Sequence, residues 1–95
     1  MLIELIEIKR DSRGVYSLGK VYVNPQQIIY MSENLSMKNS LKEGKMNLGL
    51  NQNLTSFTNI KLNHNNYASD IIVVGHPELI ESKIVTKQQK QLLKG

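Results

Sequence analysis

The sequence predicts a mainly β fold, in which a five-stranded, strongly bent antiparallel sheet or partial barrel is followed by a C-terminal helix. Three observations favour this fold class. Five short segments have the alternating or continuous apolar residues that are typical of strands. Turn-forming Gly, Pro, Asn and Asp residues separate the early segments. A Pro-Glu pair then opens a final segment that ends in lysines, which is typical of a helix. The strands are expected at about residues 2–9, 15–23, 28–33, 55–63 and 69–75, and the helix at about residues 77–93.

Length and composition predict a single domain, residues 1–95. The chain contains no cysteine, so neither disulfides nor thiolate metal sites can stabilise it. Small domains without such links commonly gain stability by oligomerisation. The net charge of +4 permits a nucleic-acid or acidic partner without requiring one.

The first two expected strands differ in pattern. Residues 2–9 are mostly Ile and Leu, interrupted by Glu4 and Glu7, and are expected to be mostly buried. Residues 15–23 have three valines on one parity and tyrosine, leucine and lysine on the other, so one face should be buried. Gly19 predicts a bulge or a close backbone approach within this strand.

A turn and an uncertain insert surround the third strand. Pro25 lacks a backbone donor and is expected to lie in the turn before residues 28–33. Residues 34–53 are the uncertain insert. They contain either a short helix from about Ser36 to Glu43, ended by Gly44, or a functional loop.

The last two strands are expected to lead directly into the helix. Residues 55–63 alternate polar and apolar residues, and the "NHNNYA" stretch after them is expected to be a polar loop. Ile71–Val74 is an unbroken apolar run, which predicts the most buried strand. Gly75 then gives the backbone freedom, His76 is expected to be a junction residue rather than a ligand, and Pro77 begins the helix.

The expected helix carries lysines along one side. Their spacing of four, three and four residues places Lys83, Lys87, Lys90 and Lys94 on one continuous face. A bound polyanion would relieve the repulsion between them and release counterions. The alternative is a solvated face that only keeps the protein in solution.

The chain resembles the Sm and Sm-like (LSm) family over roughly residues 2–75, because Gly19, Val21, the "NPQQ" turn and Ile28 keep the spacing of the family's first motif. The likeness is to the divergent Sm-like proteins of marine cyanophages in particular. It implies a bent five-stranded sheet that joins edge to edge into a ring and binds RNA. Such pairing would cover both edges of an open sheet. The sequence lacks the family's acidic turn residue and has no arginine before Gly75.

The resemblance implies that RNA contacts come from two loops, here "NPQQ" and "NHNNY". Amide side chains in these loops can read base edges, and Tyr67 offers a stacking face. The residues expected to bind nucleic acid, from the loops and the helix together, are Asn24, Gln26, Asn63, His64, Asn65, Asn66, Tyr67, Lys83, Lys87, Lys90 and Lys94. The alternative is that the loop residues are ordinary turn formers.

Catalysis is not expected from this sequence. His64 and His76, the only histidines, lack the spacing of metal ligands, so neither a metal nor a cofactor is expected. Ser69, Asp70 and His76 fall within eight residues without a nucleophile-elbow pattern, and chance explains their proximity.

The sequence therefore predicts a non-catalytic, homo-oligomeric ring that binds single-stranded RNA, or DNA, in RNA processing or regulation. The alternative is a structural or protein-interaction module of a phage, in which the sheet edges and the helix bind protein. A cytoplasmic location, in the host cell if the protein is phage-encoded, is expected. Charged residues interrupt the N-terminal apolar stretch, and no apolar run approaches the roughly 20 residues that a membrane helix needs.

Overall fold

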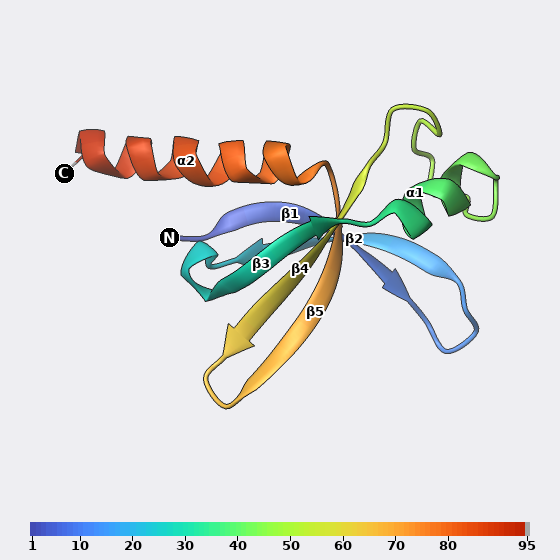
Figure 1. The fold of residues 1–95 in the computed structure, drawn as a ribbon, viewed down its shortest axis with the longest axis horizontal. Helices are drawn as coiled ribbons and strands as arrows, with labels where there is room; N and C mark the ends of the chain where they lie inside the picture. Colours follow the sequence, from blue (N-terminus) through green and yellow to red (C-terminus); the bar gives the residue numbers. More distant parts are fainter. Residues whose placement is uncertain (95) are drawn as a thin grey trace.

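The protein folds into a single five-stranded antiparallel sheet with a long helix at its C-terminal end (Figure 1). The computed structural model describes the backbone of residues 1–94 and the side chains of residues 1–89. The strand order is β2-β1-β5-β4-β3, so the predicted mainly β fold is confirmed. The elements are β1 (Ile3–Arg10), β2 (Tyr16–Val23), η1 (Pro25–Gln27), β3 (Ile28–Glu33), α1 (Leu35–Lys42), β4 (Phe57–His64), β5 (Tyr67–Val74) and α2 (Pro77–Lys94).

The sheet is open rather than closed into a barrel. In the part of the chain that the structure describes, β2 and β3 each pair with a strand on one side only. These two edge strands follow one another in the chain and are joined by the short link at residues 24–27. Val23 and Ile28, at the two ends of that link, pack into the same apolar cluster. The edges are therefore linked at this end of the sheet without being paired.

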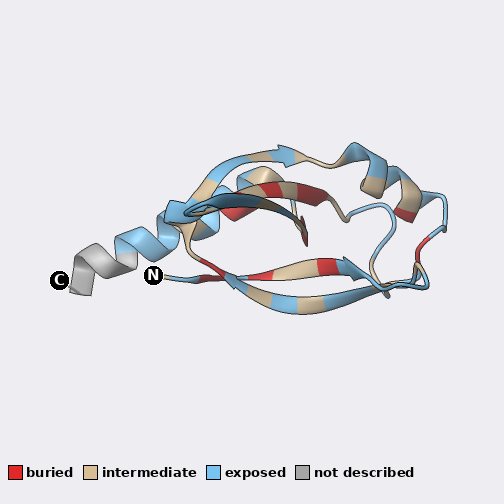
Figure 2. Cartoon of the chain, turned by 90° about the horizontal axis from the view of Figure 1, so that it is seen from below, coloured by how far each residue is buried: buried red, intermediate tan, exposed pale blue. Residues whose placement is uncertain are grey.

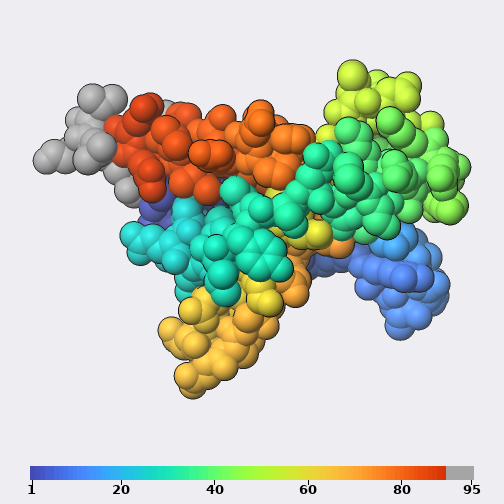
Figure 3. Space-filling model, in the orientation of Figure 1, coloured from blue at the N-terminus to red at the C-terminus, as the bar shows by residue number. Residues whose placement is uncertain are grey.

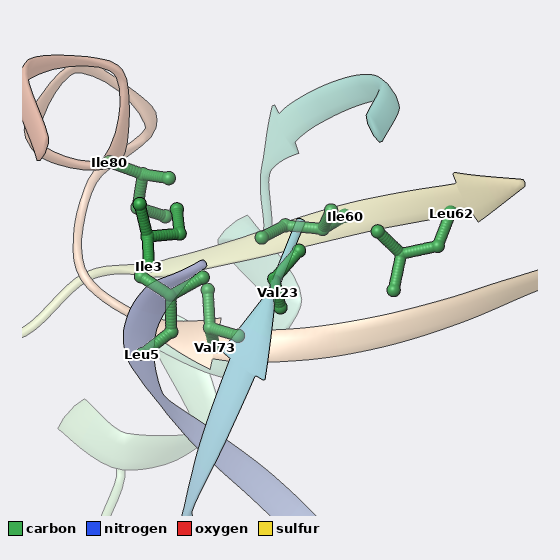
Figure 4. Packing of buried hydrophobic residues seen from close by; sticks show 7 residues of the cluster. All are labelled: Ile3, Leu5, Val23, Ile60, Leu62, Val73 and Ile80. Carbon is green, nitrogen blue, oxygen red and sulfur yellow. The ribbon is translucent and has the colours of Figure 1, made fainter. Parts of the chain in front are cut away.

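One face of the sheet packs against α2. The cluster beneath the helix includes Leu5, Ile60, Val73 and Ile80, all of them essentially inaccessible to solvent. Figure 4 shows these side chains converging from β1, β4, β5 and α2. Burying one such side chain contributes about 1.5–3 kcal/mol, so this cluster holds the helix on the sheet.

The opposite face packs against α1 and the segment that follows it. Ile8 and Phe57 from the sheet are buried together with Leu41 and Met46 from the insert. The predicted short helix of the insert is confirmed as α1, and the side chain of Asn34 caps it by accepting from the backbone N–H of Met37. The insert is therefore a cover for one end of the sheet.

The junction between β5 and α2 explains why the chain changes direction there. Gly75 has φ +120°, a conformation that L side chains rarely adopt. Its carbonyl accepts a hydrogen bond from the Thr58 hydroxyl at 2.7 Å, and its N–H donates to Ser56 O. His76 Nδ1 accepts from the Glu78 N–H at 3.3 Å, so His76 is the junction residue that was predicted.

Only the first half of α2 lies on the sheet. Ile80 is fully buried and Ile84 is partly buried, but every described residue from Val85 to Gln89 is exposed. Figure 2 shows this change from buried to exposed along the helix. The later turns of α2 extend past the apolar cluster that anchors its beginning.

Gly75→Ala is expected to lower the free energy of unfolding by about 1–3 kcal/mol, because alanine at this φ is strained. Urea denaturation followed by circular dichroism measures the change. Gly19→Ala is the matched control, because an added Cβ there would meet no atom within 4 Å. Equal effects of the two substitutions would contradict the role assigned to Gly75.

Three expectations about the strands are wrong. Gly19 marks no bulge, because β1 and β2 stay in unbroken register, and the register shift lies instead at Ile28/Tyr30 in β3. β5 is neither the most buried strand nor buried on both faces: Val73 is fully buried, its apolar neighbours are only partly buried, and β4 has four buried residues. β1 is not mostly buried either, since three of its eight residues are buried. Coverage by α1 and α2 reaches only part of each face, and this limits burial along these strands.

Candidate nucleic-acid interface

The β4–β5 hairpin ends in a two-residue turn made of Asn65 and Asn66. His64 pairs directly with Tyr67, so both belong to strands and not to the longer loop that was predicted. Asn65 has φ +63°, a conformation that asparagine adopts more readily than most residues. The tight turn therefore fixes the spacing of the side chains on either side of it.

Three side chains meet at this turn on one face of the hairpin. The rings of His64 and Tyr67 lie 5.2 Å apart between centroids, with an angle of 31° between their planes. His64 Nε2 and Ser69 Oγ are 2.8 Å apart, a hydrogen-bond distance. Tyr67 is nevertheless 66% exposed. We call this group, with the amide side chains beside it, the tip surface: Asn63, His64, Asn65, Asn66, Tyr67 and Ser69.

Ser69 was not among the residues predicted for this interface. A hairpin with two turn residues places positions 64 and 67 opposite each other, and positions 62 and 69 opposite each other. The Asn-Asn pair between two alternating segments was the sequence signal for such a turn. Treating "NHNNYA" as a loop concealed the proximity of Ser69 to His64.

The second predicted loop lies at the same end of the sheet as the tip surface. Ile28, directly after the loop, pairs with Leu62 near the end of β4, and η1 contacts β4. The side-chain oxygen of Asn24 is already used in a hydrogen bond, which it accepts from the Gln26 N–H at 3.0 Å. The Gln26 side chain is exposed. The structure thus places both predicted loops at one end of the sheet, with Asn24 serving as the cap of η1.

The lysines of α2 form a separate surface. Lys83 and Lys87 are exposed and lie four residues apart on the helix, whereas the side chains of Lys90 and Lys94 lie outside the described residues. Figures 1 and 3 show the β4–β5 hairpin directed away from α2. The structure therefore does not bring Lys83 and Lys87 together with the tip surface into one continuous interface.

Lys83 belongs to a charged region near the beginning of β1. Tyr22 donates a hydrogen bond to the Glu4 carboxylate at 3.1 Å, and the Lys20 ammonium lies 3.4 Å from it. Tyr22 first, then Lys20 and finally Lys83 hold the pKa of Glu4 below its usual value. Glu4 thus remains ionised near neutral pH and offsets part of the basic charge around Lys83.

The His64–Ser69 pair has the distance of a nucleophile and its base, but such pairs also need a third group that orients the imidazole. Among side chains of residues 1–89, Ser69 is the hydrogen-bond partner that the structure records for His64. Within the same described residues, no cluster of three His, Cys, Asp or Glu side chains could hold a metal ion. The arrangement suits orientation of the imidazole for contacts with a ligand.

The described helices include none that is both long and apolar enough to span a membrane. Comparisons with protein-family models, with curated proteins and with solved structures found no match.

Proposed function

We propose that this protein is a non-catalytic, cytoplasmic, self-associating protein that binds single-stranded RNA, or DNA. The observation that carries the proposal is the exposed ring of Tyr67 beside the oriented imidazole of His64. Unpaired bases stack on such rings, and each stacked base contributes about 1–3 kcal/mol. A protruding hairpin suits a single strand, whose bases can be splayed onto it, better than it suits a duplex.

The other polar groups of the tip surface give this stacking site its hydrogen-bonding capacity. Asn65 and Asn66 are exposed at the turn, so their amides can donate to and accept from base edges. The hydrogen bond to Ser69 already orients the imidazole of His64, so this side chain loses less conformational entropy when a base binds. The proposed contacts are thus stacking on Tyr67 with hydrogen bonds from the flanking amides.

The basic charge of the protein would contribute attraction at longer range. Lys83 and Lys87 lie on a different surface from the tip, and the net charge of the chain is +4. We propose that these lysines attract the phosphate backbone of a strand that extends beyond the tip. Such contacts release counterions and make binding depend on salt.

The test is fluorescence anisotropy with labelled U-rich and A-rich RNA oligonucleotides at about 50 and about 200 mM salt. Lys83→Glu with Lys87→Glu is expected to weaken binding at the lower salt and to reduce the salt slope by roughly one per lost phosphate contact. Lys42→Glu, an exposed lysine on α1, is the matched control. Absence of binding at the lower salt concentration would refute the proposal.

A second candidate function is supported by exposed apolar side chains. Leu79 and Val85 on α2 are both substantially exposed, which favours a protein-interaction module, for example of a phage. The same anisotropy experiment separates the two functions, because that module requires no affinity for RNA.

A ring is one form that the proposed self-association can take. The Sm resemblance implies a ring, and in this fold a ring would pair β2 of each copy with β3 of the next, since these are the two sheet edges. Light scattering would then give a single mass several times 10.8 kDa.

A further inference from the structure

The two edges of the sheet differ in how well they are protected. β2 keeps unbroken register with β1 along all eight of its residues. β3 has six residues and a register shift between Ile28 and Tyr30. Natural proteins blunt sheet edges with short strands and bulges, and a long regular edge is open to another strand. β2 is therefore the edge that remains available for pairing.

The backbone of β2 has hydrogen-bonding groups that point to its open side. The Asp11 N–H donates to Val15 O at 3.0 Å, which makes this a hydrogen-bonding position at the start of the β1–β2 ladder, although the Val15 N–H donates to the Asp11 carboxylate. Hydrogen-bonded and non-hydrogen-bonded pairs alternate along antiparallel strands. Gly19 consequently exchanges its bonds with β1, and the N–H and C=O groups of Leu18 and Lys20 point away from β1.

The side chains along this edge also favour association. Leu18 and Tyr22 are 36% and 58% exposed and lie on the same face of β2. An apolar hollow of about 400 Å³ adjoins the strand, and Ile6, Leu50 and Leu18 line it. Lys20 is the charged side chain of β2, and its ammonium already lies 3.4 Å from the Glu4 carboxylate. Because Lys20 is already paired with Glu4, a strand that docked on this edge would remove little charge from water.

We propose that the partner of this edge is β2 of a second copy of the chain. The two strands pair antiparallel about a twofold axis, which gives the same contacts to both copies, and twofold dimers are the commonest homo-oligomers. The result is one continuous ten-stranded sheet, twice the five strands of a single copy. This inference does not depend on RNA binding, and it competes with the ring as the form of self-association.

The sequence of β2 selects one register. Residues that lie directly opposite each other in two paired strands must point to the same face of the sheet. For β2 paired antiparallel with its own copy, two registers meet this condition and pair seven of the eight residues of each strand. In the first, the axis passes through Gly19, Leu18 faces Lys20 of the other copy, and Tyr16 faces its Tyr22. In the second, the axis passes through Lys20, so two like charges oppose each other, which is destabilising. The register centred on Gly19 is therefore the proposed one.

Cysteine cross-linking tests this register directly, because the chain has no cysteine of its own. In the proposed pairing, Gly19 faces its own copy at a non-hydrogen-bonded position, where Cα atoms are about 4.5 Å apart and a disulfide can form. Gly19→Cys also fits the monomer, since an added Cβ there meets no atom within 4 Å. Under mild oxidation, Gly19→Cys is expected to give a covalent dimer of twice 10.8 kDa.

Ser17→Cys is the matched control for the cross-link. Ser17 is exposed on the same face of the same strand, but it faces Val21 of the other copy. Its distance from the second Ser17 would be about 14 Å, too long for a disulfide. Equal cross-linking of the two variants, or faster cross-linking of Lys20→Cys, would overturn the register.

A pair of substitutions at Leu18 tests the interface without cysteine. Leu18→Lys would place like charges opposite each other twice, whereas Leu18→Glu would place opposite charges there. The dissociation constant of the dimer, measured by light scattering over a dilution series, is expected to be roughly tenfold higher for Leu18→Lys than for Leu18→Glu. A monomer at high micromolar concentration, or a mass well above that of a dimer, would overturn the proposal.

Discussion

Phe57→Ala is expected to lower the free energy of unfolding by about 3–5 kcal/mol, the largest change in stability predicted for this protein. Phe57 has no exposed surface and is among the largest buried side chains. It stands where β4 begins and packs with Leu41 and Met46 from the insert and with Ile8 from β1. Removal of its ring would leave a cavity between the sheet and the insert. Because both are close-packed, neither the strands nor α1 would fill this cavity completely.

Urea denaturation of the wild type and the variant measures this loss. A change of this size is a large fraction of the 5–15 kcal/mol that typically stabilises a domain, so Phe57→Leu, with a smaller expected loss, keeps the measurement accessible if Phe57→Ala does not fold. Leu54→Ala is the control, because Leu54, directly after the insert and three residues before Phe57, is 82% exposed. Its expected effect is within about 0.5 kcal/mol. Similar losses for Phe57→Ala and Leu54→Ala would show that the insert does not cover the sheet as described.

The strands and the C-terminal helix could be predicted because their signals are local. Alternation in β2 and β4, and a proline followed by a glutamate at Pro77, depend only on neighbouring residues. The strand order and the partial burial of β5 could not be predicted in this way. Burial depends on how far α1 and α2 reach across the two faces, which no local pattern of β5 encodes.

The candidate interface was predictable in its residue types but not in its layout. The tight turn at Asn65 joins His64, Tyr67 and Ser69, whereas the sequence interpretation placed the first two in a loop and left Ser69 out. The separation of the lysines from the tip also could not be foreseen. It depends on the direction in which α2 leaves Gly75, and that direction is set by packing of Ile80 against the sheet.

Tyr67→Ala is expected to weaken binding of single-stranded RNA by roughly 5- to 150-fold, the range that corresponds to loss of one stacked base. Because Tyr67 is exposed and lies outside both apolar clusters, its removal should leave stability nearly unchanged. Tyr67→Phe retains the ring and is expected to keep most of the affinity. This contrast separates stacking from hydrogen bonding by the phenol hydroxyl.

The control for this prediction is Tyr30→Ala, since Tyr30 is similarly exposed, at 51%, but lies on the opposite face of the sheet from Tyr67. Anisotropy titrations with one RNA at one salt concentration should then show a large loss for Tyr67→Ala and little change for Tyr30→Ala. If both substitutions weaken binding equally, the effect comes from the general loss of aromatic surface. If neither does, while the lysine variants still weaken binding, the RNA lies along α2 and the tip surface has another role. A loss confined to Tyr67→Ala would place the bases at the hairpin turn, where the exposed ring, the oriented imidazole and the flanking amides converge.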